Sequence, residues 1–580
     1  MNQRLLEPIK YYDTEGKATH RKNAEVYFDK LVASSGINVE ENRKTVGEYK
    51  AEMDKISLLD KKISRNKAAK VFLIIGIILS AIAIGISFAL FGKYLGAAFI
   101  TLGIGIAALV ICILILVKKV NPVLKSAREL RELSQEKANE LRDIAEKQMA
   151  PLNALFDERD TITLMETTLP EINFEDTYTK EQEELFIKHY DFIDLESEEC
   201  SMTQALSGKF EGNPFLFCRC LMHELKNVTY HGSLVISWTE TYRDKDGNRR
   251  TRRRTQTLHA SVTKPKPFYH YNNYLAYGSQ AAPSLTFSRC PQVKAGMDEK
   301  DIDKKVRKGE KKLKKKAEKA MKRGGHFQEM TNAEFDVLFG AENRSNEVEF
   351  RLMYTPLAQK NTVDLVTSKS GYGDDFYFTK HKKFNIITTN HSQSWDMNTS
   401  PSNYFSYDVD EAKRRFVDFN MSFFKTVFFD FAPLLSVPAY LEEPCKSLET
   451  PEAYLSNYPY YEHESIANAF DIKRFLPDFS IEQGILKTHL IEKRDKEDII
   501  GVTAYSYTTM EHIDYVPVLG GDGRMHGVPV CWTEYLPTEK TTSVSVSGTG
   551  MSRKEFDRRK GVETAFLECE LLHGLIGKIL

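Results

Sequence analysis

The chain has 580 residues, which at ~150 residues per domain leaves room for roughly three or four domains. Charged residues make up 28% and hydrophobic residues 42%, ordinary values that exclude a wholly disordered, collagen-like or disulfide-scaffold chain. The 80 basic and 81 acidic residues give a net charge of −1, which argues against nucleic-acid binding through the overall field.

The first elements in chain order are helical. Residues 1–37 form an N-terminal segment, and residues 38–70 carry apolar side chains at steps of three, four and seven, from Val39 to Ile63. Residues 118–158 repeat this pattern from Val123 to Leu152. We expect the two segments to form an antiparallel helical, coiled-coil stalk, with a pair of ordinary surface helices as the alternative.

Two uncharged apolar runs lie between these segments. Residues 71–91 would form a helix of about 31 Å, enough to cross a bilayer, and residues 95–117 are slightly longer. Only three residues separate the runs, so a two-helix transmembrane hairpin is predicted. The alternative, a core hairpin of a soluble protein, does not fit well because such helices normally carry a polar face.

Basic residues flank both runs on the outside. Five lie just before the first run and five just after the second, whereas Lys93 alone lies between them. Because Lys and Arg are retained in the cytoplasm, both termini are predicted to be cytoplasmic. The protein is therefore expected in the cell (plasma) membrane with two spans. The eight cysteines show no disulfide-framework spacing, which agrees with a cytoplasmic domain.

Small residues in the spans recur at a spacing that allows close helix packing. We expect them to pack the two spans on each other, with homo-oligomerisation as the alternative. No ionisable residue lies within either run, so a channel or transporter is not expected. The packing residues are Ala81, Gly85, Gly92, Gly96, Ala97, Thr101 and Gly105.

Residues 159–297 form a β-rich cytoplasmic region. Alternating residues from Leu234 to Tyr242, a turn at 244–248 and alternation from Leu258 to Val262 predict a β-hairpin. A second hairpin is predicted from Val502 to Trp532, with its turn at 520–523.

A basic helix is predicted at 298–324. Between Lys304 and Arg323 it has twelve basic and two acidic residues, and near a bilayer each basic residue can contribute about 1 kcal/mol of attraction to anionic lipid. The alternative is a solvated helical insertion; nucleic acid is not expected here because no aromatic platform is interleaved. The candidate lipid-binding residues are Lys304, Lys305, Arg307, Lys308, Lys311, Lys312, Lys314, Lys315, Lys316, Lys319, Lys322 and Arg323.

Residues 325–580 form an α+β cytoplasmic region, in which helices are predicted at 410–431 and at 553–580. A further helix is predicted at 179–194, within the preceding β-rich region. The aromatic stripe of the helix at 410–431, from Phe416 to Phe431, indicates a core face, with a helix on the membrane surface as the alternative.

No catalytic motif is found. Cys218, Cys220 and His223 form C-x-C-x-x-H without a convincing fourth ligand, so neither a metal nor a cofactor is expected. If a hydrolytic site exists, we expect it among the polar residues of 374–396. These are Asp374, Asp375, His381, His391, Trp395 and Asp396.

The stretch from Gly208 to Phe215, followed by Tyr230 to Val235, resembles a pattern in uncharacterised bacterial membrane proteins that join a two-span hairpin to a cytoplasmic β-rich domain. The resemblance implies a bacterial cell membrane and no activity. The sequence thus predicts an α+β membrane protein that binds, scaffolds or senses something near the bilayer. Its expected partners are the lipid bilayer, anionic lipid, and a protein partner or second copy; the alternative functions are a membrane-tethered hydrolase and lipid or nucleic-acid binding through the basic helix.

Overall fold

The computed structural model describes residues 5–90, 95–192, 199–243, 248–294, 296–325, 327–441 and 456–580. The chain divides into two compact units. Unit 1 contains Met1–Asn23, Asp157–Thr399 and Asn420–Leu580, and unit 2 contains Ala24–Phe156 and Ser400–Phe419.

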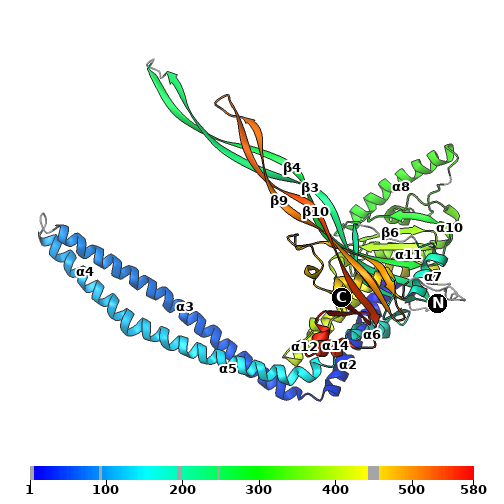
Figure 1. Cartoon of the computed structure of the whole chain (residues 1–580), viewed down its shortest axis with the longest axis horizontal. Helices are drawn as coiled ribbons and strands as arrows, with labels where there is room; N and C mark the ends of the chain where they lie inside the picture. Colours follow the sequence, from blue (N-terminus) through cyan, green and yellow to red (C-terminus); the bar gives the residue numbers. More distant parts are fainter. Residues whose placement is uncertain are drawn as a thin grey trace. The chain divides into compact units, whose positions relative to one another are not determined.

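Unit 2 consists mainly of long helices (Figure 1). The helix α3 runs without a break through the predicted stalk and first span, and the returning helix is continuous from 95 to 153. A wide π-turn, η3, interrupts the α-helical pattern just before Pro122, whose ring has no N–H and crowds the preceding turn. The elements are α3 (Val39–Leu90), α4 (Leu95–Ile115), η3 (Leu116–Val120), α5 (Asn121–Asn153) and the part of α2 (Lys17–Ser35) that begins at Ala24.

Within the described residues, two helices are long and apolar enough to cross a membrane. In the most apolar 18-residue stretch of each helix, only 11% (Val39–Phe88) and 6% (Phe99–Asn153) is buried inside the protein. The side chains of Phe72, Ile82 and Ile104, for example, are 74%, 53% and 66% exposed. Outside these stretches, α3 and α5 pack together through a small core of Ile63, Val120, Leu124 and Ala127.

Unit 1 contains two open antiparallel sheets. The seven-stranded sheet has the order β1-β2-β3-β4-β7-β6-β5 and the five-stranded sheet the order β11-β12-β10-β9-β8. The first sheet consists of β1 (Ile172–Phe174), β2 (Cys200–Phe210), β3 (Asn213–Arg243), β4 (Arg249–Gly278), β5 (Thr286–Arg289), β6 (Phe376–His381) and β7 (Phe384–Thr389). The second consists of β8 (Ile485–Lys493), β9 (Glu497–Leu519), β10 (Met525–Gly548), β11 (Cys569–Leu572) and β12 (Leu575–Ile579).

Helices cover the sheets of unit 1. The second part of α12 buries Phe423, Phe424, Phe428 and Phe431 in the main core, so the core interpretation of the aromatic stripe holds. In unit 2, Phe416 of the same helix packs on Phe28, Phe156 and Tyr404. The helices are α1 (Pro8–Tyr11), α6 (Arg159–Thr168), α7 (Lys180–Tyr190), α8 (Glu299–Lys322), α9 (Ala333–Phe339), α10 (Glu347–Met353), α11 (Pro356–Val366), α12 (Val409–Leu435), α13 (Tyr460–Ala469) and α14 (Arg553–Lys560).

The predicted C-terminal helix over 553–580 is wrong beyond its first two turns. Only Arg553–Lys560 is α-helical, and the strands β11 and β12 follow as a tight hairpin. The turn residues His573 and Gly574 both have positive φ, at 50° and 74°, which ends any helix there.

Both predicted hairpins are present, and both are much longer than their sequence alternation indicated. Strand β2 pairs with β3 only as far as Met222, so His223–Arg243 and Arg249–Tyr269 continue as a two-stranded ribbon. At 3.3 Å per residue this first ribbon is about 70 Å long. The second ribbon consists of Thr509–Leu519 of β9 and Met525–Tyr535 of β10.

The two ribbons run side by side (Figure 1) and pack through their even-numbered faces. Ile236 and Leu258 of the first ribbon form a small core with Val528 of the second. An ion pair between Lys264 and Asp514, 3.2 Å, adds to this contact. An isolated two-stranded ribbon is marginally stable in water, so each ribbon supports the other.

Gly232 is the point of closest approach between the ribbons. A Cβ atom at this position would lie 2.0 Å from the carbonyl oxygen of Pro529 and 2.9 Å from Cγ2 of Val530. Only glycine therefore fits without moving the backbone of the second ribbon.

Gly232→Ala should separate the ribbons locally, because overpacking of this kind destabilises by about 1–3 kcal/mol. We expect faster hydrogen exchange at the amides of residues 514–518 and 528–532 and a lower thermal midpoint. The control is Gly527→Ala on the outer face, where a new Cβ would meet Tyr515 Cβ at an ordinary 3.4 Å. Equal exchange in both variants would contradict this packing.

Candidate functional site

The basic helix α8 docks on the body of unit 1 through one narrow stripe. Ile302, Val306, Gly309 and Leu313 follow each other at helical spacing, and Ile302 and Leu313 are buried. A Cβ on Gly309 would lie 2.4 Å from Cγ1 of Val337, so glycine allows α8 to approach α9 closely. The end of the predicted apolar side does not pack, since Met321 is 80% exposed.

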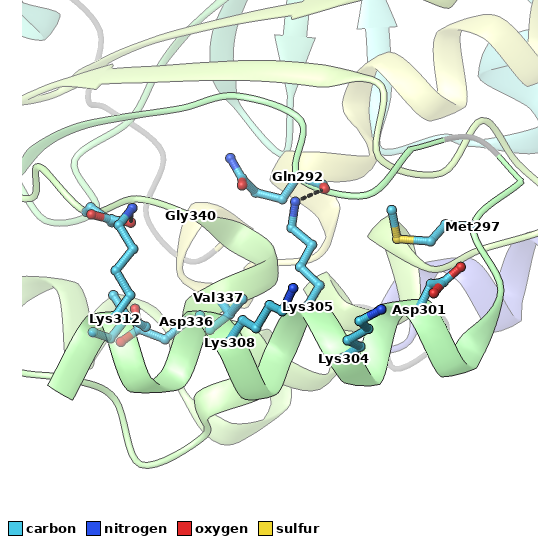
Figure 2. Close-up of a pocket in the computed structure, with 13 residues that line it drawn as sticks. Gln292, Met297, Asp301, Lys304, Lys305, Lys308, Lys312, Asp336, Val337 and Gly340 are labelled. Carbon is cyan, nitrogen blue, oxygen red and sulfur yellow. Dashed lines mark hydrogen bonds and ion pairs between the residues drawn. The ribbon is translucent and has the colours of Figure 1, made fainter. Parts of the chain in front are cut away.

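A cavity of about 510 Å³ lies between α8, the segment around Gln292 and Met297, and residues 336–342 (Figure 2). The Lys305 ammonium donates to the carbonyl oxygen of Gln292. Lys304 and Lys308 also line the cavity, and neither has a hydrogen-bond or ion-pair partner within the described residues.

Most carboxylates that line this cavity form ion pairs with basic side chains. Asp336 is bound by the buried Arg344 at 2.5 Å, and Glu342 is bound by Lys312 at 2.9 Å and Lys316 at 3.2 Å. The hydrogen bond from Lys312, together with Lys316, lowers the pKa of Glu342. The cavity therefore presents net positive charge, which suits an anion.

The unpaired cations of α8 and of its C-cap residue Arg323 are exposed. At 100° per residue they spread over the broad part of the helix that the docked stripe leaves free, and two of them, Lys304 and Lys308, also border the cavity. Lys314 is instead paired with Glu310 at 2.7 Å. Those without a partner among the described residues are Lys304, Arg307, Lys308, Lys311, Lys315, Lys319, Lys322 and Arg323.

The residues proposed for a hydrolytic site do not form one cluster, although Asp375 and His391 meet. Asp374 is fully buried, 2.6 Å from the equally buried Arg289, and accepts the backbone N–H of Val293 at 2.7 Å. Trp395 is half-buried and packs on Phe217 and Phe423 at the edge of the main core. His381 lies at the end of β6, and Asp396 accepts the N–H of Asn398 at 3.0 Å in a loop.

Asp375 and His391 do meet, in a buried network with Asp430. The His391 ring lies 2.7 Å from Asp375 and 3.4 Å from Asp430, and Tyr372 stacks on it with ring centroids 3.8 Å apart. Burial alone would lower the pKa of His391, but the hydrogen bond to Asp375 and the charge of Asp430 raise it. Asp375, His391 and Asp430 each contact another group of the protein, although Oδ2 of Asp430 is buried without a hydrogen-bond partner among the described residues. Neither the cavity beside α8 nor the one at the ribbon roots is lined by these three residues, which favours a structural role.

The predicted metal ligands are also separated. Cys218 and Cys220 are buried together on one side of β3, whereas His223 lies on the other face, with Tyr507 Oη 3.1 Å from its ring. In the described part of the chain, no group of three or more His, Cys, Asp or Glu side chains is arranged to hold a metal ion.

The span residues singled out for packing lie in unit 2. Gly105 is close to Ile84, whose Cγ1 would be 2.9 Å from a new Cβ, and Thr101 accepts a hydrogen bond from Ser87 at 2.8 Å. Ala81 and Gly85 are exposed. Gly92 lies outside the described residues, and so do the side-chain surroundings of Gly96 and Ala97.

A second cavity, of about 690 Å³, was not anticipated from the sequence. It lies at the roots of the two ribbons and is lined by His223, Tyr269, His489, Tyr505 and Tyr507, among others. Burial lowers the pKa of His223, against the opposing charges of Glu199 and Glu224. These five residues come from four strands, β3, β4, β8 and β9, and no local motif relates them.

The Asp430 network makes stability depend on pH. Burial raises the pKa of Asp430 to about 6, against the opposing effects of His391 and Thr389. The folded state therefore holds this proton more tightly than the unfolded chain does. The protonated Asp430 therefore adds up to about 3 kcal/mol to the free energy of unfolding. This contribution is fully present below about pH 4 and is lost as the pH rises through about 6.

Asp430→Asn should therefore reduce the fall in thermal midpoint between pH 5 and pH 7, although His391 contributes in the same direction. Midpoints measured in detergent at several pH values would test this. Asp418→Asn, which changes an exposed carboxylate, should leave the slope as in the unmodified protein. Identical slopes for all three proteins would rule out Asp430 as the titrating group.

Comparisons with family models, with curated proteins and with solved structures find no match to this chain, so its sites must be interpreted from their own geometry.

Proposed function

We propose that this protein is a membrane-anchored binding or scaffold protein, held in the cell membrane by the apolar parts of α3 and α4. The observation that carries this proposal is the exposure of those parts. A core helix of a soluble protein buries most of its apolar surface, whereas 11% and 6% of these two stretches is buried. A bilayer would cover what the protein leaves uncovered.

Orientation follows from the flanking charges. Lys61, Lys62 and Lys70 precede the first span, Lys118 and Lys119 follow the second, and this distribution supports cytoplasmic termini. The packing of α3 on α5 supports an antiparallel coiled-coil stalk next to the spans. In this proposal, the described parts of unit 1 lie in the cytoplasm.

Binding is favoured over catalysis by the surfaces that unit 1 presents. Its two ribbons extend far beyond the sheets from which they start, and such exposed strands suit recognition. The hydrolase alternative has less support, because Asp374, His391 and Trp395 serve separate contacts within the protein.

Anionic lipid is the ligand class we propose for α8. Its docked stripe holds the helix on the body, and its unpaired cations lie on the part of the helix that this stripe leaves free. Lysine ammonium groups interact with anionic headgroups mainly as point charges. The tether would keep unit 1 near a membrane surface.

Anchoring can be tested by fractionation. Ile78→Asp combined with Ile104→Asp should move much of the protein from the carbonate-resistant pellet to the extractable fraction, since each central charge opposes insertion by about 2.5–3.5 kcal/mol. Leu58→Asp with Leu133→Asp, equally exposed positions outside the spans, should stay in the pellet. Reporters fused to both termini should be active only in the cytoplasm. An unmodified protein that is soluble without detergent would refute the proposal.

Lipid contact of α8 can be tested by footprinting lysines in nanodiscs. Lys308, Lys311 and Lys315 should be acylated several-fold more slowly in discs containing anionic lipid than in zwitterionic discs. Lys314, paired with Glu310, serves as the internal control and should change less. Equal rates in the two lipids would show that the helix is a solvated insertion.

A further inference from the structure

The distal end of the first ribbon is not covered by the second. The amide of Gly521, in the turn of the second ribbon, donates to the side chain of Gln256 at 2.8 Å, and Gly521 lies against Trp238. The second ribbon thus ends at the level of Trp238. Beyond it, Thr239–Arg243 and Arg249–Arg254 are all exposed.

Arginines gather at this bare end. Glu240 is the acidic residue among the described ones there, and it pairs with Arg254 at 2.6 Å. By sequence, residues 239–254 contain seven basic and three acidic residues, including the turn 244–247, which lies outside the described residues. The arginines are Arg243, Arg249, Arg250, Arg252, Arg253 and Arg254. We refer to them as the arginine tip.

Among the described residues, much of this charge has no neutralising partner. Arg243, Arg249 and Arg252 have no hydrogen-bond or ion-pair partner in the part of the chain described. Arg243 and Arg249 are moreover directly opposite each other in the β3–β4 register. Like charges in this position destabilise a ribbon, and an anion bound between them would remove the repulsion.

The arginine tip carries charge on both faces of the ribbon. Residues paired across the two strands share a face, so Arg250, Arg252 and Arg254 lie on one face and Arg249 and Arg253 on the other. Between them lie Thr239, Thr241 and Thr251, which offer hydroxyl groups and little apolar surface. The arrangement suits a ligand that surrounds the end of the ribbon.

We propose that the arginine tip binds the major groove of double-stranded DNA. The major groove of B-form DNA admits a two-stranded β-ribbon, and phosphates line both of its sides. The major groove of an RNA duplex is deep and narrow, so weaker binding to RNA is expected. Arginine can bind phosphate oxygens with two parallel hydrogen bonds. The near-neutral net charge of the chain argues against binding through its overall field and leaves such a local contact open.

A flat anionic membrane fits these observations less well. A planar surface would contact one face or the extreme end of the ribbon, leaving the arginines of the other face unused. The tip also lacks the apolar side chains that anchor proteins at a bilayer interface, with Tyr242 as its one aromatic residue among those described.

The second ribbon supports the first one, and this support agrees with a binding role for the distal end of the first ribbon. A lone ribbon of this length would be marginally stable, so its charged end would not be held in a fixed position. The second ribbon supports the first up to Trp238 and stops where the charged rungs begin.

The test uses the full-length protein in zwitterionic nanodiscs and short fluorescent duplexes of DNA and RNA. The variant Arg243→Gln, Arg249→Gln, Arg252→Gln should bind roughly ten- to a hundredfold more weakly, and its salt slope should fall by about 3, the value for three lost phosphate contacts. The control Lys308→Gln, Lys311→Gln, Lys315→Gln removes the same charge from α8 and should bind as the unmodified protein does. Replacing the same three arginines by lysine should preserve most of the salt slope, which shows that the ribbon still folds.

Several results would overturn the proposal. These are no duplex binding by the unmodified protein, equal losses in the tip and α8 variants, or competition by polyglutamate as effective as that by unlabelled duplex. If the tip variant instead loses affinity for anionic vesicles while the unmodified protein ignores duplexes, the partner is a membrane and the proposal fails.

Discussion

Three consecutive buried residues of α13 hold the two sheets of unit 1 together. Glu462 accepts the amide of Tyr178 at 2.8 Å and lies 3.0 Å from the His573 ring, and His463 lies 3.0 Å from Asp498. The next residue, Glu464, accepts the amide of Met202 in β2 and pairs with Lys487 of β8 at 2.5 Å. Since successive helical residues differ by 100°, the three side chains point in different directions and reach five separate positions of the chain. An unpaired buried charge costs about 3–5 kcal/mol, so few arrangements of the sheets satisfy all three.

The ribbons depend on this junction. Each begins in a different sheet, β3 and β4 in the seven-stranded one and β9 and β10 in the five-stranded one. With the sheets fixed, the even-numbered faces of the ribbons meet, and Ile236, Leu258 and Val528 are buried between them. The odd-numbered faces remain exposed, as Val235 and Tyr515 illustrate, at 65% and 70%. A period of two in burial therefore extends along both ribbons and reflects one long-range contact.

The sequence predicted the hairpins because local signals determine them: alternation near Trp238 and Val528, and glycine-bearing turns. It could not predict their full length. At the root of β3, both Phe217 and Cys218 are buried, so alternation disappears where the strand is covered on both sides. Helical periodicity over 553–580 misled for a related reason, since a pattern of apolar residues does not reveal the positive φ of His573.

The candidate sites show the same division between local and long-range information. Composition located the charges of α8, but the sequence could not tell which of them were free to bind a ligand. Lys312 and Lys316 are paired with Glu342, which lies 30 and 26 residues away in the sequence. The cavity at the ribbon roots escaped notice because its His and Tyr residues come from distant strands.

The two basic surfaces of unit 1 differ in chemistry, and this difference argues for two partners. The exposed face of α8 is mainly lysine on a helix docked along one side, a smooth row of point charges suited to a surface that can rearrange. The ribbon end uses arginine, whose planar fork recognises phosphate oxygens at fixed positions. It also places these side chains on two opposite faces, and Gly521 marks where the supporting ribbon stops. Positive charge alone does not distinguish the two surfaces. The arrangement of the arginines at the ribbon end therefore indicates a partner that is recognised by its shape as well as by its charge.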